Sequence, residues 1–319
     1  MDPARRGFMG ALLAMALNGA GPAAVAGRVV LDRLQPGVYV ARAGNAEVAR
    51  ANAGEVVPTL VHVTGAGVLV VDPGPHLTWG NGLLAAIRAV TPEPVRWVVN
   101  THAHPENVLA NAALACLRPR PVFLASAATA SLMGQRCEAC LARLAEQLGP
   151  AVMRGTQIVL PDPALRHGDR LATGGTAWEV QVHAAAHSAS DTVLYAPRRR
   201  LLCVGGLAYR ERVPEMQEAS LQGWRRALRA LSVLPADVVV GTAVGTPAQM
   251  LAPTLAYLDA LAEGIAGALA AGGDAARMPG PAAGKPYCRW RYFASRHPLN
   301  VQHAWRELED LWMHGEPLA

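Results

Sequence analysis

Short apolar runs alternate with segments of helical spacing along most of the chain. Residues 37–44 (GVYVARAG) and 58–74 (PTLVHVTGAGVLVVDPG) are rich in β-branched residues and broken by glycine and proline, which predicts strands and turns. Apolar residues then recur at helical spacing over residues 77–94, which predicts a helix that ends at Pro92. A predicted strand at residues 95–100 (VRWVVN) leads straight into a group of histidines.

The same alternation continues through the second half of the chain. Further strands are predicted at residues 121–126, three within 176–209, and 236–242, and further helices at 107–117, 126–155, 221–235 and 252–271. Groups of strands thus alternate with single helices in two successive blocks. This order predicts an α+β fold in which two mixed sheets pack face to face with helices outside.

The first 26 residues have the features of a signal peptide. Arg5 and Arg6 precede an apolar run at residues 8–17, and Ala24–Ala26 supply the small residues that signal peptidase requires. The paired arginines resemble a twin-arginine signal, so we expect cleavage after Ala26 and export to the periplasm. The alternative is an N-terminal helix that packs on the domain.

Composition and charge exclude two classes of protein. The formal net charge of the 319 residues is +5, and its one tight basic run, Pro197–Arg200, lies between apolar segments, where a turn explains it better than nucleic-acid binding. The apolar stretch at residues 256–273 contains Asp259 and Glu263, so it predicts a buried or amphipathic helix and no membrane span.

Five cysteines are an odd number for an exported chain. Cys137 and Cys140 have a Cys-x-x-Cys spacing that places both thiols on one helix face, where a disulfide, reduced thiols or a redox role are all open. A zinc ribbon would need a second such pair, and the sequence has none. Cys116, Cys203 and Cys288 are isolated and are interpreted as buried small residues.

The chain end predicts a docking helix. Apolar residues recur at helical spacing after Pro298 and before Gly315, and they are Val301, Ala304, Trp305, Leu308, Leu311 and Trp312. We expect this stripe to pack on the main domain and to bury both indoles. Residues 27–265 would then form the main domain, and residues 266–319 a C-terminal extension.

The candidate chemistry centres on residues 101–113 (THAHPENVLANAA). His102 and His104 are separated by one residue and can point the same way at a strand end, and His187 lies at another strand–turn junction. Three neutral imidazoles with an open fourth position form a catalytic type of zinc site, in which the pKa of bound water can fall to about 7. These three residues are called the histidine cluster below.

Three motifs together resemble the metallo-β-lactamase superfamily over roughly residues 35–265. They are VDPGP at residues 71–75, the THAHPEN segment between a strand and a helix, and AHSASD at residues 186–191. The resemblance implies an αββα sandwich and hydrolysis at one or two zinc ions. Residues 135–144, 204–215 and 300–312 are most similar to the quinoprotein relay system zinc metallohydrolases within that superfamily.

The resemblance also assigns roles to individual residues. It implies that the histidine cluster supplies all three ligands of the first zinc site. Asp72 would support the ligand loop and Asp191 would brace the turn that carries His187. His76 and His183 could each line the pocket. The remaining histidines, His62, His167, His297, His303 and His314, are interpreted as ordinary surface or core residues.

The second zinc site of the superfamily is degenerate in this sequence. Its aspartate is replaced by Glu106, its histidine by Asn107, its bridging aspartate by Gly206 and its last histidine by Thr242. One zinc ion per chain is therefore expected. Glu106 could bind the metal, act on its water as a general base, or face solvent.

Two functions remain open at this point. The first is an exported hydrolase that uses a single zinc-bound water or hydroxide on an ester, thioester or amide. The second is a catalytically inactive periplasmic protein that keeps the cleft for a small molecule or a quinoprotein partner. An iron dioxygenase of the same fold would use the bridging aspartate, and Gly206 counts against it.

Overall fold

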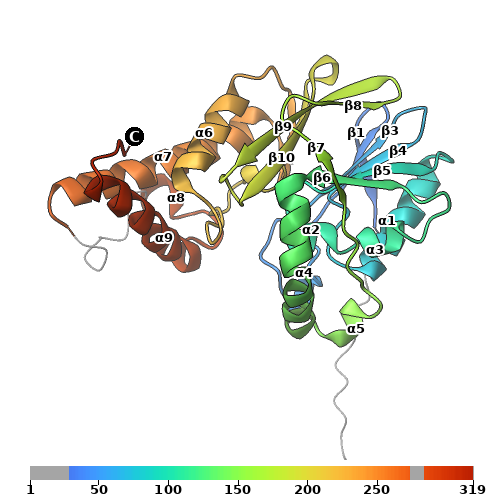
Figure 1. Cartoon of the computed structure of the whole chain (residues 1–319), viewed down its shortest axis with the longest axis horizontal. Coiled ribbons are helices and arrows are strands. Elements are labelled where there is room, and N and C mark those ends of the chain that lie inside the picture. Colours follow the sequence, from blue (N-terminus) through green and yellow to red (C-terminus); the bar gives the residue numbers. More distant parts are fainter. Residues whose placement is uncertain (1–28, 274–283, 319) are drawn as a thin grey trace, which may run out of the picture.

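Two β-sheets pack face to face and helices cover both outer faces in the computed structural model, which describes residues 29–273 and 284–318 (Figure 1). Helices α1–α5 lie on the side of the first sheet, and α6–α9 lie on the side of the second. This arrangement is the predicted αββα sandwich. The proposed signal peptide lies outside the described residues.

The sheets are both mixed. The first has the order β1 (Leu31–Gln35), β2 (Val38–Ala41), β3 (Thr59–Val63), β4 (Val68–Val71), β5 (Val95–Val99), β6 (Val122–Ser126) and β7 (Asp162–Leu165). The second has the order β13 (Val244–Gly245), β12 (Val238–Val240), β11 (Leu201–Cys203), β10 (Ser190–Ala196), β9 (Thr176–Ala184) and β8 (Arg170–Thr173). Strands β4 to β7 pair in parallel, as do β11 and β12, whereas the other pairs are antiparallel.

The helices connect and cover these strands. They are α1 (Leu77–Val90), α2 (Pro105–Val108), α3 (Asn111–Leu114), α4 (Ala127–Leu148), α5 (Pro150–Met153), α6 (Leu221–Ser232), α7 (Pro247–Ala270), α8 (Gly284–Tyr287) and α9 (Phe293–Met313). Short 3-10 helices are η1 (Arg50–Asn52), η2 (Pro197–Arg199) and η3 (Gly205–Leu207). Among the described helices, none combines the length and the hydropathy needed to cross a bilayer.

Strand β4 shows how the sequence builds the layers. All four of its residues are buried, because Val68 and Val70 pack toward α1 while Leu69 and Val71 pack between the two sheets. Successive side chains of a strand point to opposite faces, so an unbroken apolar run suits a strand covered on both sides. Separate cores thus lie between the sheets and under each layer of helices.

Several element predictions are confirmed and others are wrong. Helix α1 and the turn at Pro197–Arg200 occur as expected. The helix predicted at residues 107–117 is instead two short helices, α2 and α3. Helix α9 begins at Phe293, before Pro298, which lies inside it.

The C-terminal stripe buries one indole and leaves the other half exposed. Trp305 is 2% exposed and packs in the core formed with α6 and α7, whereas Trp312 is 50% exposed. The prediction that both are buried is therefore wrong, because Trp312 falls on the last turn, beyond the neighbouring helices that cover Trp305. Cys116 and Cys288 are likewise exposed where buried residues were expected; Cys203 is buried.

Candidate metal centre

The candidate residues all lie on loops that leave strands at one edge of the sandwich. Asp72 follows β4, the first two histidines of the cluster follow β5, and His187 follows β9. Gly206 follows β11 and Thr242 follows β12. Because β4 and β5 are parallel neighbours, as are β11 and β12, the segments that follow them start side by side.

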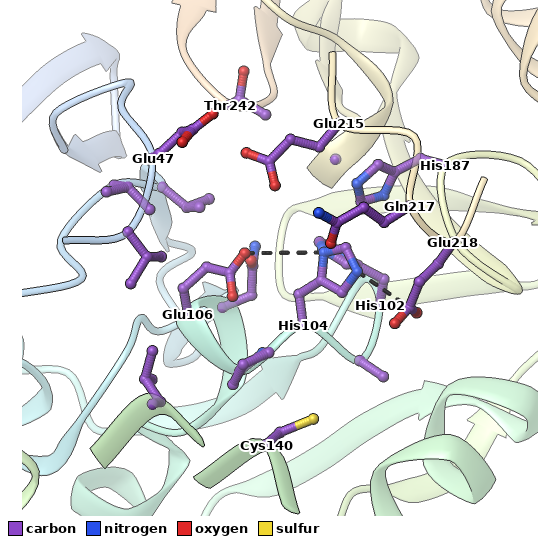
Figure 2. A pocket seen from close by; sticks show the side chains of 18 of the residues that line it. Glu47, His102, His104, Glu106, Cys140, His187, Glu215, Gln217, Glu218 and Thr242 are labelled. Carbon is purple, nitrogen blue, oxygen red and sulfur yellow. Dashed lines mark ion pairs between the residues drawn. The ribbon is translucent and has the colours of Figure 1, made fainter. Parts of the chain in front are cut away.

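The histidine cluster forms the floor of a cavity of about 250 Å³ (Figure 2). The ring centroids of His102, His104 and His187 are 4.7 to 5.0 Å apart, and one possible ligand atom from each lies within 4.8 Å of the others. His102 and His187 are buried, and the side chain of His104 is 24% exposed. Rotations of the rings can therefore direct three nitrogens at one ion.

Asp72 fixes the start of the loop that carries His102. It has a left-handed backbone with φ of 51°, which is strained for a residue with a side chain. Its carboxylate accepts bonds from Thr101 N at 2.8 Å, Thr101 Oγ1 at 2.6 Å and Asn107 Nδ2 at 3.3 Å. Burial raises the pKa of Asp72 to about 6, and the bonds from Thr101 and Asn107 oppose that rise.

The hydrogen bonds around Thr101 leave one nitrogen of His102 free to bind a metal. The single hydroxyl hydrogen of Thr101 goes to Asp72, so Thr101 Oγ1 must accept from His102 Nδ1, which lies at 2.8 Å. The Nε2 lone pair of His102 is then available to a metal. Burial lowers the pKa of His102 well below its usual value, so this imidazole is neutral as a ligand must be.

His187 is held from two sides. Its Nδ1 lies 3.1 Å from Asp191 Oδ1, and Asp191 Oδ2 accepts a bond from Ser188 N at 2.7 Å. The ring of Trp224 lies edge-on at 5.2 Å, and its indole Nε1 donates to Leu207 O at 2.9 Å. Asp191 thus has the contacts expected of a brace, and Trp224 of α6 adds a packing contact.

His104 lies between two carboxylates. Its Nδ1 is 3.9 Å from Glu106 Oε1, and its Nε2 is 3.8 Å from Glu218 Oε2 (Figure 2). Burial lowers the pKa of His104, but Glu218 and Glu106 outweigh burial and raise it to about 9. Contacts with His104 and Arg136 hold the pKa of Glu218 well below its usual value.

The donor set of the cluster fits zinc. Three imidazoles converge from three sides and leave the fourth side open to the cavity, which is the arrangement of catalytic zinc sites. Within the described part of the chain, no other group of three or more histidine, cysteine or acidic residues comes as close together. One metal position is therefore available, and His102, His104 and His187 are the residues that would hold an ion there.

Of the four replaced positions of the second site, only Glu106 brings a carboxylate into the cavity. The amide of Asn107 is directed to Asp72, and Thr242 Oγ1 donates to Ala208 O at 3.1 Å. Glu106 reaches the cavity with 20% of its side chain exposed. A Cβ at position 206 would lie 2.2 Å from Cε1 of His187, so the ring of His187 fills the space where a bridging carboxylate would begin.

Three ion pairs form part of the cavity wall. Glu47 pairs with Arg296, Glu215 with Arg212, and Glu218 with Arg136, and all six residues line the cavity. Arg136, Arg212 and Glu215 fall within segments that carry the narrower resemblance, but that resemblance assigns no role to any of the six residues, which come from separated parts of the chain. Sequence reasoning therefore missed them, as it missed Trp224.

The two further histidines considered for the pocket do not line it. His76 caps α1 by accepting a bond from Trp79 N at 3.0 Å, and His183 lies beside His167 with the ring centroids 6.4 Å apart.

The thiols of Cys137 and Cys140 are both free. Cys140 faces the cavity wall, whereas burial raises the pKa of Cys137 to about 11.

Comparisons with known proteins agree on one family. The family model described as the metallo-beta-lactamase superfamily matches residues 52–243. Among curated proteins, a sequence search finds none that matches the chain.

Solved structures share the fold at low sequence identity. A metallo-beta-lactamase from Pontibacter korlensis matches with a TM-score of 0.58 and 22% identity, over 72% of this chain and 99% of that one. The metallo-beta-lactamase FIM-1 from Pseudomonas aeruginosa in its mono-zinc form matches with a TM-score of 0.56 and 16% identity, over 72% and 95%. A metallo-beta-lactamase from Hirschia baltica matches with a TM-score of 0.54 and 17% identity, over 72% of this chain and 97% of that one. The matched segment, the αββα sandwich and the loops at its edge agree, and the chain belongs to the metallo-beta-lactamase superfamily.

Proposed function

We propose that this protein is an exported hydrolase that works with a single zinc ion. The observation that carries the proposal is the histidine cluster, whose three imidazoles converge on the cavity while a glycine stands where a second ion would need a carboxylate. The superfamily is typically zinc-dependent, and one similar structure, that of FIM-1, is a mono-zinc form.

Each residue of the site has a role in this proposal. A zinc ion held by the cluster would polarise a substrate carbonyl and lower the pKa of a bound water. Asp72 orients the ring of His102 through Thr101. Asp191 orients the ring of His187 directly, at Nδ1. Glu106, with its carboxylate in the cavity beside His104, is placed to accept a proton from water and return it to the leaving group.

The cavity suits a small-molecule substrate. Its volume of about 250 Å³ and its wall of paired charges suit a compact polar ester, thioester or amide. The four arginines and four glutamates that line it balance one another, so nothing in the lining selects a highly charged substrate.

Metal content tests the proposal directly. Protein purified without chelator should contain about one zinc per chain by elemental analysis, as a three-histidine site predicts. His104→Ala should lose it, because two imidazoles bind zinc far more weakly than three. Asn107→Ala, whose amide faces Asp72, and His183→Ala, which lies outside the cavity, should keep it. Wild-type protein that holds no zinc even when folded with it would rule out the hydrolase.

Turnover tests the role of Glu106. Glu106→Gln should keep its zinc yet lower kcat by about 10²- to 10⁴-fold on a panel of chromogenic esters, thioesters and amides. If zinc-loaded wild-type protein hydrolyses none of these classes, the alternative is favoured, namely an inactive protein that binds a small molecule or a quinoprotein partner in the cavity.

We further propose that the protein acts in the periplasm, in association with a quinoprotein system. The support is in the sequence alone: the paired arginines, the short apolar run and the small residues before Gly27, together with the narrower resemblance described above. Replacing Arg5 and Arg6 by lysine should leave the precursor in the cytoplasm. Normal periplasmic accumulation of that variant would exclude the twin-arginine route.

A further inference from the structure

A chain of charged contacts extends from the histidine cluster to helix α4. Glu218 lies on the irregular segment between η3 and α6, with Oε2 3.8 Å from His104 Nε2. The same carboxylate receives two bonds from Arg136 of α4, one of them from Nη1 to Oε2 at 2.8 Å. Glu218 thus bridges a ring of the cluster and a long helix.

Each histidine of the cluster has a polar partner beside one of its ring nitrogens. For His102 this partner is Thr101, and for His187 it is Asp191, both on Nδ1. For His104, Glu218 lies 3.8 Å from Nε2 and Glu106 lies 3.9 Å from Nδ1, and we assign the partner role to Glu218 and leave Nδ1 for an ion. Metal-binding histidines usually donate their other N–H to such a partner, which fixes the tautomer and the ring orientation.

Glu218 needs support of its own, because no helix or strand holds it in place. Arg136 supplies this support through a two-pronged contact, which restricts both the position and the plane of the carboxylate. Arg136 is one-half exposed at the cavity rim and contacts none of the three rings through a hydrogen bond or ion pair within the described residues.

We infer that Glu218, held by Arg136, is the positioning residue that orients His104 for metal binding. The inference rests on the proposed zinc site and adds to it two residues to which the sequence assigned no role, Glu218 and Arg136. Arg136 of α4 contacts none of the three histidines, yet it should influence metal affinity through its contact with Glu218.

Zinc affinity, measured by competition with a chromophoric chelator on the full-length protein, tests this role. Glu218→Ala should weaken zinc binding by about 10- to 100-fold, the range for lost partners of ligand histidines. Glu218→Gln keeps an acceptor oxygen and should lie in between, and Arg136→Ala should weaken binding by about 3- to 10-fold. The matched control is Glu215→Gln, which removes a cavity carboxylate paired with Arg212 and should leave zinc affinity unchanged.

The absorption spectrum of the cobalt-substituted protein gives a second readout, because its bands report ligand geometry. They should shift in Glu218→Ala and Arg136→Ala and stay in place in Glu215→Gln, with far-UV circular dichroism unchanged in all three. Wild-type zinc affinity and a wild-type cobalt spectrum in both Glu218 variants would overturn the inference. A loss of zinc affinity in Glu215→Gln as large as that in Glu218→Ala would also overturn it. Those results leave the single-zinc proposal intact, whereas wild-type protein that binds no zinc overturns both.

Discussion

At the scale of single residues, Gly206 decides how much room the histidine cluster has. The ring of His187 lies close to both position 206 and the indole of Trp224. A side chain at 206 would displace the imidazole, whose surroundings include Trp224, a fully buried residue bonded to Leu207. His187 can therefore occupy its position only because residue 206 is a glycine with no side chain.

This packing predicts that restoring the carboxylate will not restore a second metal site. Gly206→Asp should reduce the zinc content below one per chain, because its Cβ alone would lie 2.2 Å from the ring of His187. Thr242→His is the control, since it restores another of the replaced ligands at a position away from that space. Elemental analysis of both variants checks the prediction, and two zinc ions in Gly206→Asp would contradict it.

His62 is a buried histidine with no part in the proposed chemistry. It is fully buried on β3 with its ring edge-on to Trp178 at 5.6 Å, and neither ring nitrogen has a hydrogen-bond partner within the described residues. Burial lowers its pKa to about 4, and the charge of Arg199 contributes to the same shift. The native ring is therefore neutral across the physiological range.

This depressed pKa predicts a loss of stability in acid. Between about pH 6.5 and 4 the unfolded chain takes up a proton at His62 that the folded chain excludes, so unfolding becomes easier as pH falls, by about 3 kcal/mol in all. Above pH 6.5 both states are neutral and the effect vanishes. His62→Leu should remove this part of the pH dependence, measured by urea unfolding of metal-free protein at pH 7 and 4.5.

The control for this prediction is His314→Leu, at an exposed position near the chain end. It should follow the wild-type pH dependence closely. An identical acid-induced loss in His62→Leu and wild-type protein would show that other groups are responsible.

Sequence reasoning reaches some residues of the site and misses others for a physical reason. The three histidines and Asp72 come soon after strands β4, β5 and β9, so their places in the sequence reflect one edge of the sandwich. Glu218 lies on irregular backbone, and nothing in its local sequence indicates that Arg136 and His104 will meet there. Only the folded loops bring these residues together.

At the scale of elements, a regular helix with an apolar stripe could be predicted from the sequence, whereas the residue at which helix α9 begins could not. Helix α1 matches its periodicity because Leu83, Leu84 and Ile87 form one buried face. Helix α9 extends back past Pro298 because tertiary contacts hold the helix beside this proline. Two residues after it, Asn300 Nδ2 donates to Pro214 O at 2.8 Å and to the Tyr257 hydroxyl at 3.0 Å. Such contacts offset the bond that proline cannot make.

The stripe of α9 predicts unequal effects for its two tryptophans. Trp305→Ala should lower the free energy of unfolding by about 3 to 5 kcal/mol, because it empties a buried site. Trp312→Ala, at a side chain 50% exposed, should cost less than about 1 kcal/mol. Guanidinium unfolding of both variants tests this, and equal losses would mean that the two indoles are buried alike.

At the scale of the whole molecule, the C-terminal segment joins loops beside the metal cavity and contributes Arg296 to its wall. Arg291 N donates to Glu211 O and Val213 N donates to Arg291 O, while the guanidinium of Arg291 donates to Asn45 O at 2.8 Å. Two loops far apart in the sequence are thus joined by residues beyond the segment that the family model matches. Periodicity predicted that this region would dock, but the sequence had no signal for its place beside the cavity.

This connection predicts that the end of the chain rigidifies loops that line the site. Arg291→Ala should lower the free energy of unfolding by about 1 kcal/mol, the usual contribution of a hydrogen bond. More specifically, hydrogen–deuterium exchange should become faster in residues 44–47, because that loop loses its bonds to the guanidinium, while α1 keeps its protection. Arg289→Ala, an exposed arginine on the same segment, is the matched control and should leave both regions unchanged. Unaltered exchange in Arg291→Ala would mean that the loop holds its shape through its other contacts, such as the bond of Asn45 to Arg210 and the contacts of Glu47 with Tyr292 and Arg296.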